Sequence, residues 1–137
     1  MHEVAYQKKV VRLAEGDQRI EFEGQYDYNR IGEILEGIDV VIVPSIWYEN
    51  APLTIMTGLA YGIPVVVSDI GGMREAIREG RNGLTFRVGD PDDLSRRISS
   101  IAGNPGILEE FKKTLQYPIR AEEEAFNTEL VYKGLFP

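Results

Sequence analysis

Residues 39–68 decide the fold of this 137-residue chain, and they read DVVIVPSIWYENAPLTIMTGLAYGIPVVVS. Two short runs with unbroken β-branched centres, residues 39–43 and 64–68, lie at the two ends of this stretch. Continuous apolarity is typical of strands that are covered on both faces, as in parallel sheets. The apolar segment between them, residues 53–62, is predicted to be a buried helix that ends at Gly62. The stretch therefore predicts a strand–helix–strand unit.

The alternation of strands and helices continues on both sides of this unit. Further strands are predicted at residues 19–24, where apolar and polar residues alternate, and at 84–86. Further helices are predicted at residues 3–14, 31–38, 73–78, 106–116 and 121–133, and from Asp90, which is followed by Pro91, to about residue 102. We therefore expect one α/β domain over residues 1–137, with a Rossmann-like parallel sheet, helices on both faces, a core at residues 18–102 and a helical tail at residues 104–137.

The composition excludes several classes of function. The net charge of −7 argues against a nucleic-acid-binding protein. The absence of cysteine removes disulfides, thiolate metal sites and cysteine nucleophiles, and the one histidine, His2, lies at the start of the chain. The longest apolar run, residues 40–43, is far shorter than the ~20 residues that span a bilayer. With no transmembrane segment and no signal peptide in view, we expect a cytoplasmic protein.

Two loops are candidate ligand sites, because parallel sheets bind ligands beyond the carboxyl ends of their strands. The first loop, residues 44–52, carries Glu49 at the start of a helix, where free backbone N–H groups favour a phosphate. The second contains Gly71 and Gly72, which permit a close approach of the backbone. Each feature alone has an ordinary explanation, since a loop glutamate is commonly a solvated acid or a helix cap and two glycines commonly form a turn.

An ordered set of motifs connects the two loops. In chain order the motifs are residues 22–24 (FEG), 44–45 (PS), 49–53 (ENAPL), 62–66 (GIPVV), 68–72 (SDIGG), Glu75, 80–83 (GRNG) and 89–94 (GDPDDL). This set resembles the C-terminal, donor-binding domain of a retaining glycosyltransferase of the GT-B fold, family 4, also called group 1. The resemblance covers about residues 5–133.

The resemblance implies sugar transfer from a nucleotide-diphosphate sugar, with retention at the anomeric carbon and without a metal ion or another cofactor. Glu49 matches the first of two glutamates that contact the donor in this family, and it is the candidate catalytic residue, facing the sugar hydroxyls. The backbone amides that follow are expected to hold the sugar and the distal phosphate; they belong to Asn50, Ala51, Leu53 and Thr54. The other residues expected to bind the donor are Thr57, Gly24, Gln25, Tyr26, Gly71 and Gly72.

The chain departs from the family pattern in two ways. Thr57 stands where the family has its second glutamate, so ribose binding is expected to be weaker by ~1–3 kcal/mol. The family domain also begins with two strands, whose loops bring an arginine and a lysine to the diphosphate, and these strands have no counterpart here. An acceptor-binding domain has no counterpart either. We therefore expect this chain to be part of a catalytic unit and to be inactive by itself.

The sheet edge is a further expectation. In the family the first strand lies beside the strand that matches residues 39–43, which is therefore expected to present an unpaired apolar edge. Two outcomes are predicted: a rearranged sheet, with residues 19–24 beside residues 39–43, or exchange of strands or helices between chains, giving a homo-oligomer.

Two other functions fit the same residues. The first is a non-catalytic module that binds nucleotide sugars or mediates assembly, which the threonine at position 57 favours. The second is a fragment of a sugar-nucleotide epimerase of the GT-B fold, although the pattern from Glu49 to Gly72 resembles the transferases more closely.

Overall fold

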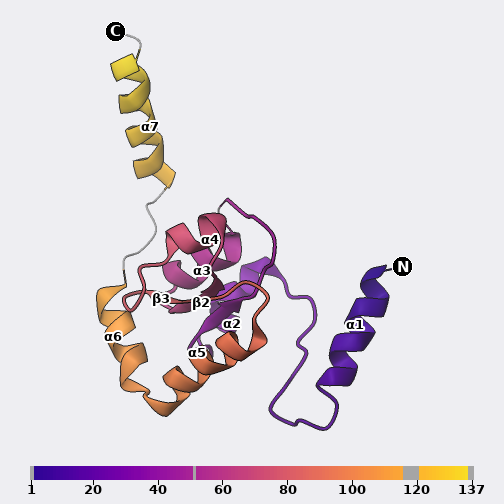
Figure 1. Ribbon diagram of the computed structural model, residues 1–137. Helices are drawn as coiled ribbons and strands as arrows, with labels where there is room; N and C mark the ends of the chain where they lie inside the picture. Colours follow the sequence, from indigo (N-terminus) through magenta and orange to yellow (C-terminus); the bar gives the residue numbers. More distant parts are fainter. Residues whose placement is uncertain (1, 51, 116–120, 136–137) are drawn as a thin grey trace. The chain divides into compact units, whose positions relative to one another are not determined.

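The computed structural model describes residues 2–50, 52–115 and 121–135 (Figure 1). Its contacts divide the chain into two compact units, Met1–Ile31 and Gly32–Pro137. The first unit contains α1 (His2–Leu13) and the 3-10 helix η1 (Tyr28–Arg30), and α2 (Ile31–Leu35) begins at the boundary. The second continues with β1 (Val41–Val43), α3 (Leu53–Ala60), β2 (Val65–Ser68), α4 (Gly71–Ala76), β3 (Gly83–Phe86), α5 (Pro91–Gly103), α6 (Gly106–Thr114) and α7 (Ala121–Leu135).

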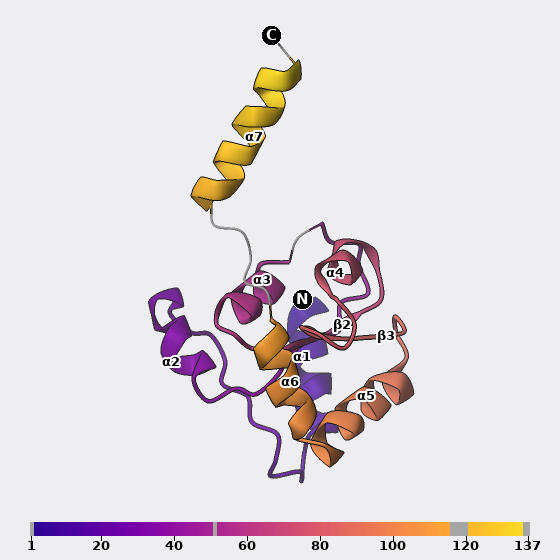
Figure 2. The same ribbon diagram turned by 90° about the vertical axis from the view of Figure 1, so that its left-hand side faces the viewer.

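The second unit is built on a parallel sheet with the strand order β1-β2-β3. Val65 and Val67 of β2 pack with α3 and α4, whereas Val66 packs on the opposite face with Phe86 and with Ile101 of α5. Figures 1 and 2 show α3 and α4 over one face of the sheet and α5 and α6 over the other. Burial on both faces explains why the strands are apolar without alternation, and it confirms the predicted α/β class.

The predicted helices and the three strands of the sheet are present, with boundaries shifted by a few residues. Asp90 caps α5 by accepting a hydrogen bond from the N–H of Asp93 (2.9 Å), and Pro91 is the first helical residue, as the sequence predicts. The helix expected over residues 31–38 ends early, at Leu35, just before Gly37 lowers the helical propensity. The division into a core at residues 18–102 and a tail at residues 104–137 stays a prediction.

The strand predicted at residues 19–24 is wrong. This segment is irregular, and the side chains of Ile20 and Phe22 are 48% and 53% exposed. The rearranged sheet is wrong as well, because in the described residues β1 pairs with β2 alone. An alternating pattern gives a segment two different faces, but a strand also needs a hydrogen-bonded neighbour, which this segment lacks. Exchange between chains stays a prediction.

None of the described helices is both long enough and apolar enough to cross a membrane.

Candidate functional site

The two predicted loops meet at the carboxyl ends of neighbouring strands. β1 ends at Val43 and leads into residues 44–52, and β2 ends at Ser68 just before the glycines that open α4. The backbone N–H of Gly72 donates a hydrogen bond to the backbone oxygen of Glu49 over 3.0 Å. The parallel sheet thus brings together two segments that lie more than twenty residues apart in the sequence.

Close packing explains why glycine occupies both positions of the second loop. A Cβ atom at residue 72 would lie 1.7 Å from the backbone oxygen of Asn50 and 2.7 Å from that of Glu49. At Gly71 the φ angle is +50°, and a Cβ atom would lie 3.2 Å from Cδ1 of Tyr48. The close approach that the sequence predicts at these glycines is therefore made by the backbone of the Glu49 loop.

The carboxylate of Glu49 is exposed and is held by a neighbouring hydroxyl. Ser45 Oγ donates a hydrogen bond to Glu49 Oε1 over 3.0 Å, and it accepts one from the N–H of Trp47 over 3.3 Å. Ser45 belongs to the motif at residues 44–45 but was not among the predicted site residues, although a serine near a turn commonly bonds the backbone two residues on. Trp47 and Tyr48, which directly precede Glu49 in the sequence, are 75% and 84% exposed.

The first turn of α3 offers backbone donors four and five residues after Glu49 in the sequence. Pro52 precedes the helix in an extended conformation, and its carbonyl accepts hydrogen bonds from the N–H groups of Ile55 (3.0 Å) and Met56 (3.3 Å). The N–H groups of Leu53 and Thr54 precede these and have no acceptor within the helix. The first turn contains no acidic residue, so its partial positive charge is available to an anion.

The other predicted site residues are placed in different surroundings. Thr57 is half-buried on α3, one turn after the exposed N–H groups. Gly24, Gln25 and Tyr26 belong to the first unit, in an exposed irregular segment, and their contact with the base stays a prediction. Ala51 lies outside the described residues.

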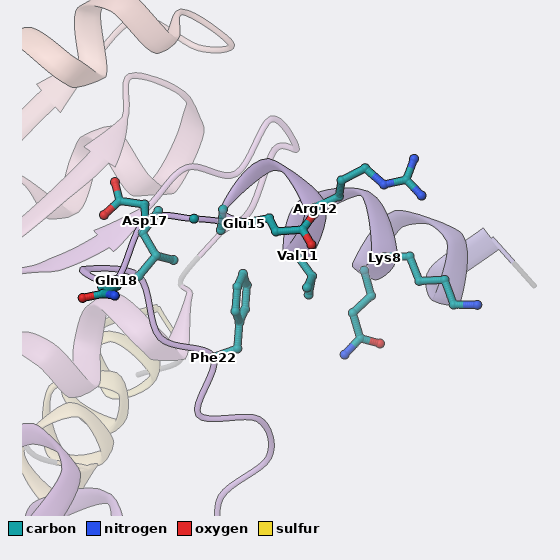
Figure 3. Close-up of a pocket in the computed structure, with 11 residues that line it drawn as sticks. Lys8, Val11, Arg12, Glu15, Asp17, Gln18 and Phe22 are labelled. Atoms are coloured by element: carbon teal, nitrogen blue, oxygen red, sulfur yellow. The ribbon is translucent and has the colours of Figure 1, made fainter.

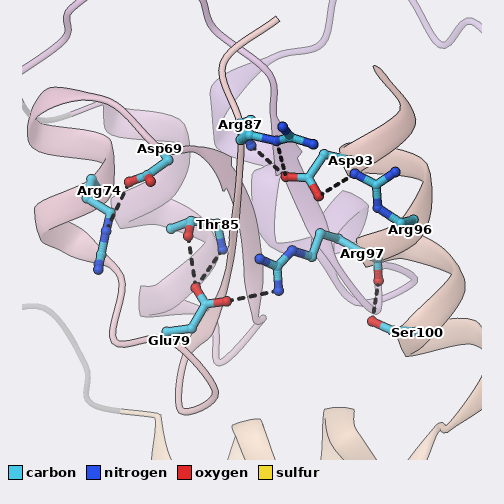
Figure 4. Close-up of polar contacts among 9 residues, drawn as sticks. All are labelled: Asp69, Arg74, Glu79, Thr85, Arg87, Asp93, Arg96, Arg97 and Ser100. Atoms are coloured by element: carbon cyan, nitrogen blue, oxygen red, sulfur yellow. Dashed lines mark hydrogen bonds and ion pairs between the residues drawn. The ribbon is translucent and has the colours of Figure 1, made fainter. Parts of the chain in front are cut away.

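Charged side chains near the two loops form mutual pairs (Figure 4). Arg74 Nε lies 3.0 Å from Asp69 Oδ1, directly after β2. Glu79 accepts hydrogen bonds from the N–H (2.8 Å) and the hydroxyl (3.0 Å) of the buried Thr85, and Arg97 reaches its other oxygen over 3.2 Å. Through Glu79 this second set connects β3 to α5, and Arg97 is paired within it.

Asp93, at the start of α5, has a lowered pKa. The backbone N–H of Arg87 donates to Asp93 Oδ2 over 2.8 Å, and this hydrogen bond is the main cause, with smaller contributions from the side chains of Arg96 and Arg87. The carboxylate therefore helps to hold the end of β3 against the first turn of α5.

A separate hollow of about 630 Å³ lies within the first unit (Figure 3). The side chains of Val11 and Phe22 form part of the apolar lining of this hollow, and Lys8 and Arg12 of α1 are its basic residues. None of the predicted site residues lines this hollow. Across the described ranges, no group of three or more His, Cys, Asp or Glu side chains could hold a metal ion.

The parallel sheet and the helices on both of its faces define an α/β domain of the Rossmann type, with a candidate ligand loop after β1. The family model described as "Glycosyl transferases group 1" matches residues 3–104, and the chain belongs to this family. This match confirms the resemblance found in the sequence.

Similar proteins agree with this assignment. The D-inositol 3-phosphate glycosyltransferase of Streptomyces bingchenggensis is 27% identical over 101 residues, which is 74% of this chain and 22% of that protein. Sucrose-phosphate synthase from Thermosynechococcus elongatus has a TM-score of 0.77 at 24% identity, over 96% of this chain and 35% of that one. The C-terminal domain of the group 1 glycosyl transferase LpcC from Francisella tularensis has a TM-score of 0.73 at 17% identity, over 82% of this chain and 60% of that one.

The matches cover only part of the length of each relative. The chain spans about a quarter of the length of the first curated relatives that it matches. The two structural likenesses show the fold alone, which is the Rossmann-like fold found in GT-B glycosyltransferases.

Proposed function

We propose that the Glu49 loop and the first turn of α3 bind the sugar and the distal phosphate of a nucleotide-diphosphate sugar for retaining glycosyl transfer. The observation that carries this proposal is the hydrogen bond from the N–H of Gly72 to the backbone oxygen of Glu49 (3.0 Å). It holds the main chain of Glu49, whose side chain is exposed, against the start of α4 at the carboxyl end of a parallel sheet, which is where such sheets bind ligands.

The two kinds of group suit the two ends of the donor. A carboxylate accepts hydrogen bonds from sugar hydroxyls, so Glu49 fixes the orientation of the sugar. The N–H groups of Leu53 and Thr54 suit phosphate oxygens. During transfer the bond from the anomeric carbon to the diphosphate breaks, negative charge grows on the leaving oxygen, and preorganised donors stabilise that charge. A new bond forms from the anomeric carbon to the hydroxyl oxygen of the acceptor, and the hydroxyl proton passes to the leaving diphosphate oxygen.

The acceptor must be supplied from outside the described residues. The chain spans about a quarter of the length of its first curated relatives, so we expect it to bind the donor without turning it over. A transfer assay with labelled donor tests this part, and sustained turnover by the isolated chain contradicts it.

Donor binding is testable by calorimetric titration of the chain with several nucleotide sugars and with the matching free nucleotides. We expect tighter binding of the nucleotide sugar than of the nucleotide, and we expect Glu49→Gln to remove this difference. Glu36→Gln is the matched control, since Glu36 is an exposed glutamate that follows α2, outside the loop. The proposal fails if no nucleotide sugar binds, or if Glu49→Gln leaves the difference unchanged.

A second candidate function, a non-catalytic nucleotide-sugar-binding module, rests on Thr57. This half-buried residue of α3 supplies a hydroxyl where the family uses a carboxylate for the ribose. If weak ribose binding is what limits the chain, Thr57→Glu should tighten free nucleotide about tenfold, since a charged hydrogen bond is worth about 1.5 kcal/mol. An unchanged nucleotide affinity speaks against a ribose contact at this position.

A further inference from the structure

We propose that Ser45 is a positioning residue for Glu49, holding the carboxylate in the orientation that receives the donor sugar. This inference rests on the proposed function. Ser45 lies two residues after the end of β1, and its side chain is half-buried, whereas Glu49 is exposed. The serine is therefore attached to the rigid end of the sheet, and the glutamate is attached to the loop.

The hydrogen bonds of Ser45 specify the direction of its single proton. A hydroxyl has one O–H donor and accepts through its lone pairs. The N–H of Trp47 donates to Ser45 Oγ over 3.3 Å, so this contact uses a lone pair. The proton is left for Glu49 Oε1, which lies 3.0 Å away and accepts it as an ionised carboxylate. Ser45 Oγ thus makes both hydrogen bonds that hold the turn from residue 45 to residue 49.

A second contact fixes the other half of Glu49. Its backbone oxygen accepts from the N–H of Gly72, which holds the main chain against the start of α4. The main chain and the side chain are therefore held separately, one by β2–α4 and the other by β1. Both contacts are needed, because an exposed glutamate loses rotamer entropy when it is fixed in one conformation.

The contact leaves the carboxylate able to bind a ligand. Two carboxylate oxygens provide about four lone-pair sites, and Ser45 uses one of them. The others are available to sugar hydroxyls, whereas a free nucleotide makes no use of them. Ser45 should therefore affect the affinity for a nucleotide sugar and leave the affinity for the matching nucleotide unchanged.

The test compares Ser45→Ala with Ser45→Thr, which retains the hydroxyl, by calorimetric titration of the chain with a nucleotide sugar and the matching nucleotide. We expect Ser45→Ala to weaken nucleotide-sugar binding about tenfold, the effect of losing one hydrogen bond to a charged group, with nucleotide binding unchanged. Ser45→Thr should bind like the wild type. In the free chain, three-bond couplings of Glu49 should show its χ1 angle fixed in the wild type and averaged in Ser45→Ala.

The double variant Ser45→Ala/Glu49→Gln separates a positioning role from a structural one. If Ser45 acts through Glu49, the double variant binds nucleotide sugar no more weakly than Glu49→Gln. Additive losses, or equal weakening of nucleotide and nucleotide sugar, mean a structural role and overturn the inference. If Glu49→Gln weakens binding and Ser45→Ala does not, the inference fails and the proposed function stands. If Glu49→Gln has no effect, both fail.

Discussion

Replacing Gly72 with alanine should both destabilise the domain and displace Glu49. The new Cβ atom would lie 1.7 Å from the backbone oxygen of Asn50, and such contacts are essentially never closer than 3.0 Å, so the loop must retreat by about 1.3 Å. That shift lengthens the 3.0 Å hydrogen bond between the N–H of residue 72 and the oxygen of Glu49 beyond a useful range.

The size of the effect follows from three contributions. Overpacking costs about 1–3 kcal/mol, and the lost hydrogen bond costs about 1 kcal/mol. The lower entropy of the unfolded chain offsets about 0.4–1 kcal/mol of this cost. We therefore expect Gly72→Ala to lower the free energy of unfolding by about 1–3.5 kcal/mol. Urea denaturation followed by circular dichroism measures this change, and calorimetric titration measures nucleotide-sugar binding.

Two further glycine substitutions serve as controls. Gly37→Ala should be nearly neutral, because no heavy atom lies within 4 Å of its Cβ position. Gly83→Ala places its Cβ atom 1.9 Å from the backbone oxygen of Val65, so it should destabilise to a similar extent on the side of β2 away from β1. Below the unfolding transition, only Gly72→Ala should also lose the preference for nucleotide sugar over nucleotide. Wild-type stability of Gly72→Ala would refute the close contact, and wild-type binding by a folded Gly72→Ala chain would refute the role of the contact in donor binding.

Three other expectations concern stability and association. Ser68 Oγ is buried and has no hydrogen-bond partner among the described residues, so Ser68→Ala should raise the free energy of unfolding in urea by about 1 kcal/mol, and a decrease would contradict this. The pKa of Asp93 is lowered in the folded state, chiefly by the N–H of Arg87, so its contribution is present above the unfolded pKa and is lost as the pH falls through the lower, folded pKa. Unfolding of the wild type should therefore depend more steeply on pH below about pH 4 than that of Asp93→Asn, and parallel curves would show that the carboxylate contributes nothing. β1 is an edge strand in the described sheet, and Ile42 is 39% exposed beside an apolar hollow of about 320 Å³, so we expect concentration-dependent association by sedimentation velocity that Ile42→Lys reduces; a monomer at all concentrations would contradict it.

The sheet could be predicted from the sequence because its signals are local. The unbroken β-branched centre of β2 and the cap formed by Asp90 before Pro91 each require only a few neighbouring residues. The position of the candidate site followed as well, since it depends on where β1 and β2 end. These properties come from strand ends and helix starts, which turn residues and capping residues specify in the sequence itself.

The wrong strand prediction and the unpredicted loop contact have a common physical cause. Residues 19–24 alternate as a strand does, yet a strand exists only where another strand supplies hydrogen bonds, and composition cannot show whether one is present. The contact between Gly72 and Asn50 was beyond prediction for the same reason, because it arises when two distant loops meet. A dipeptide such as Gly71-Gly72 therefore indicates that another group packs closely against its backbone. It does not indicate whether that group is a ligand or another segment of the chain.

This ambiguity bears directly on how the site works. Because the backbone of Glu49 and Asn50 occupies the space over Gly72, we expect the glycine pair to affect donor binding through the loop that it holds. The loop is then fixed at its glutamate by α4 and at its start by β1, where Ser45 reaches the carboxylate. A sugar that binds Glu49 would therefore meet a carboxylate already connected to both strands. Preorganisation of this kind lets an exposed side chain bind a hydroxyl without first losing its own conformational freedom.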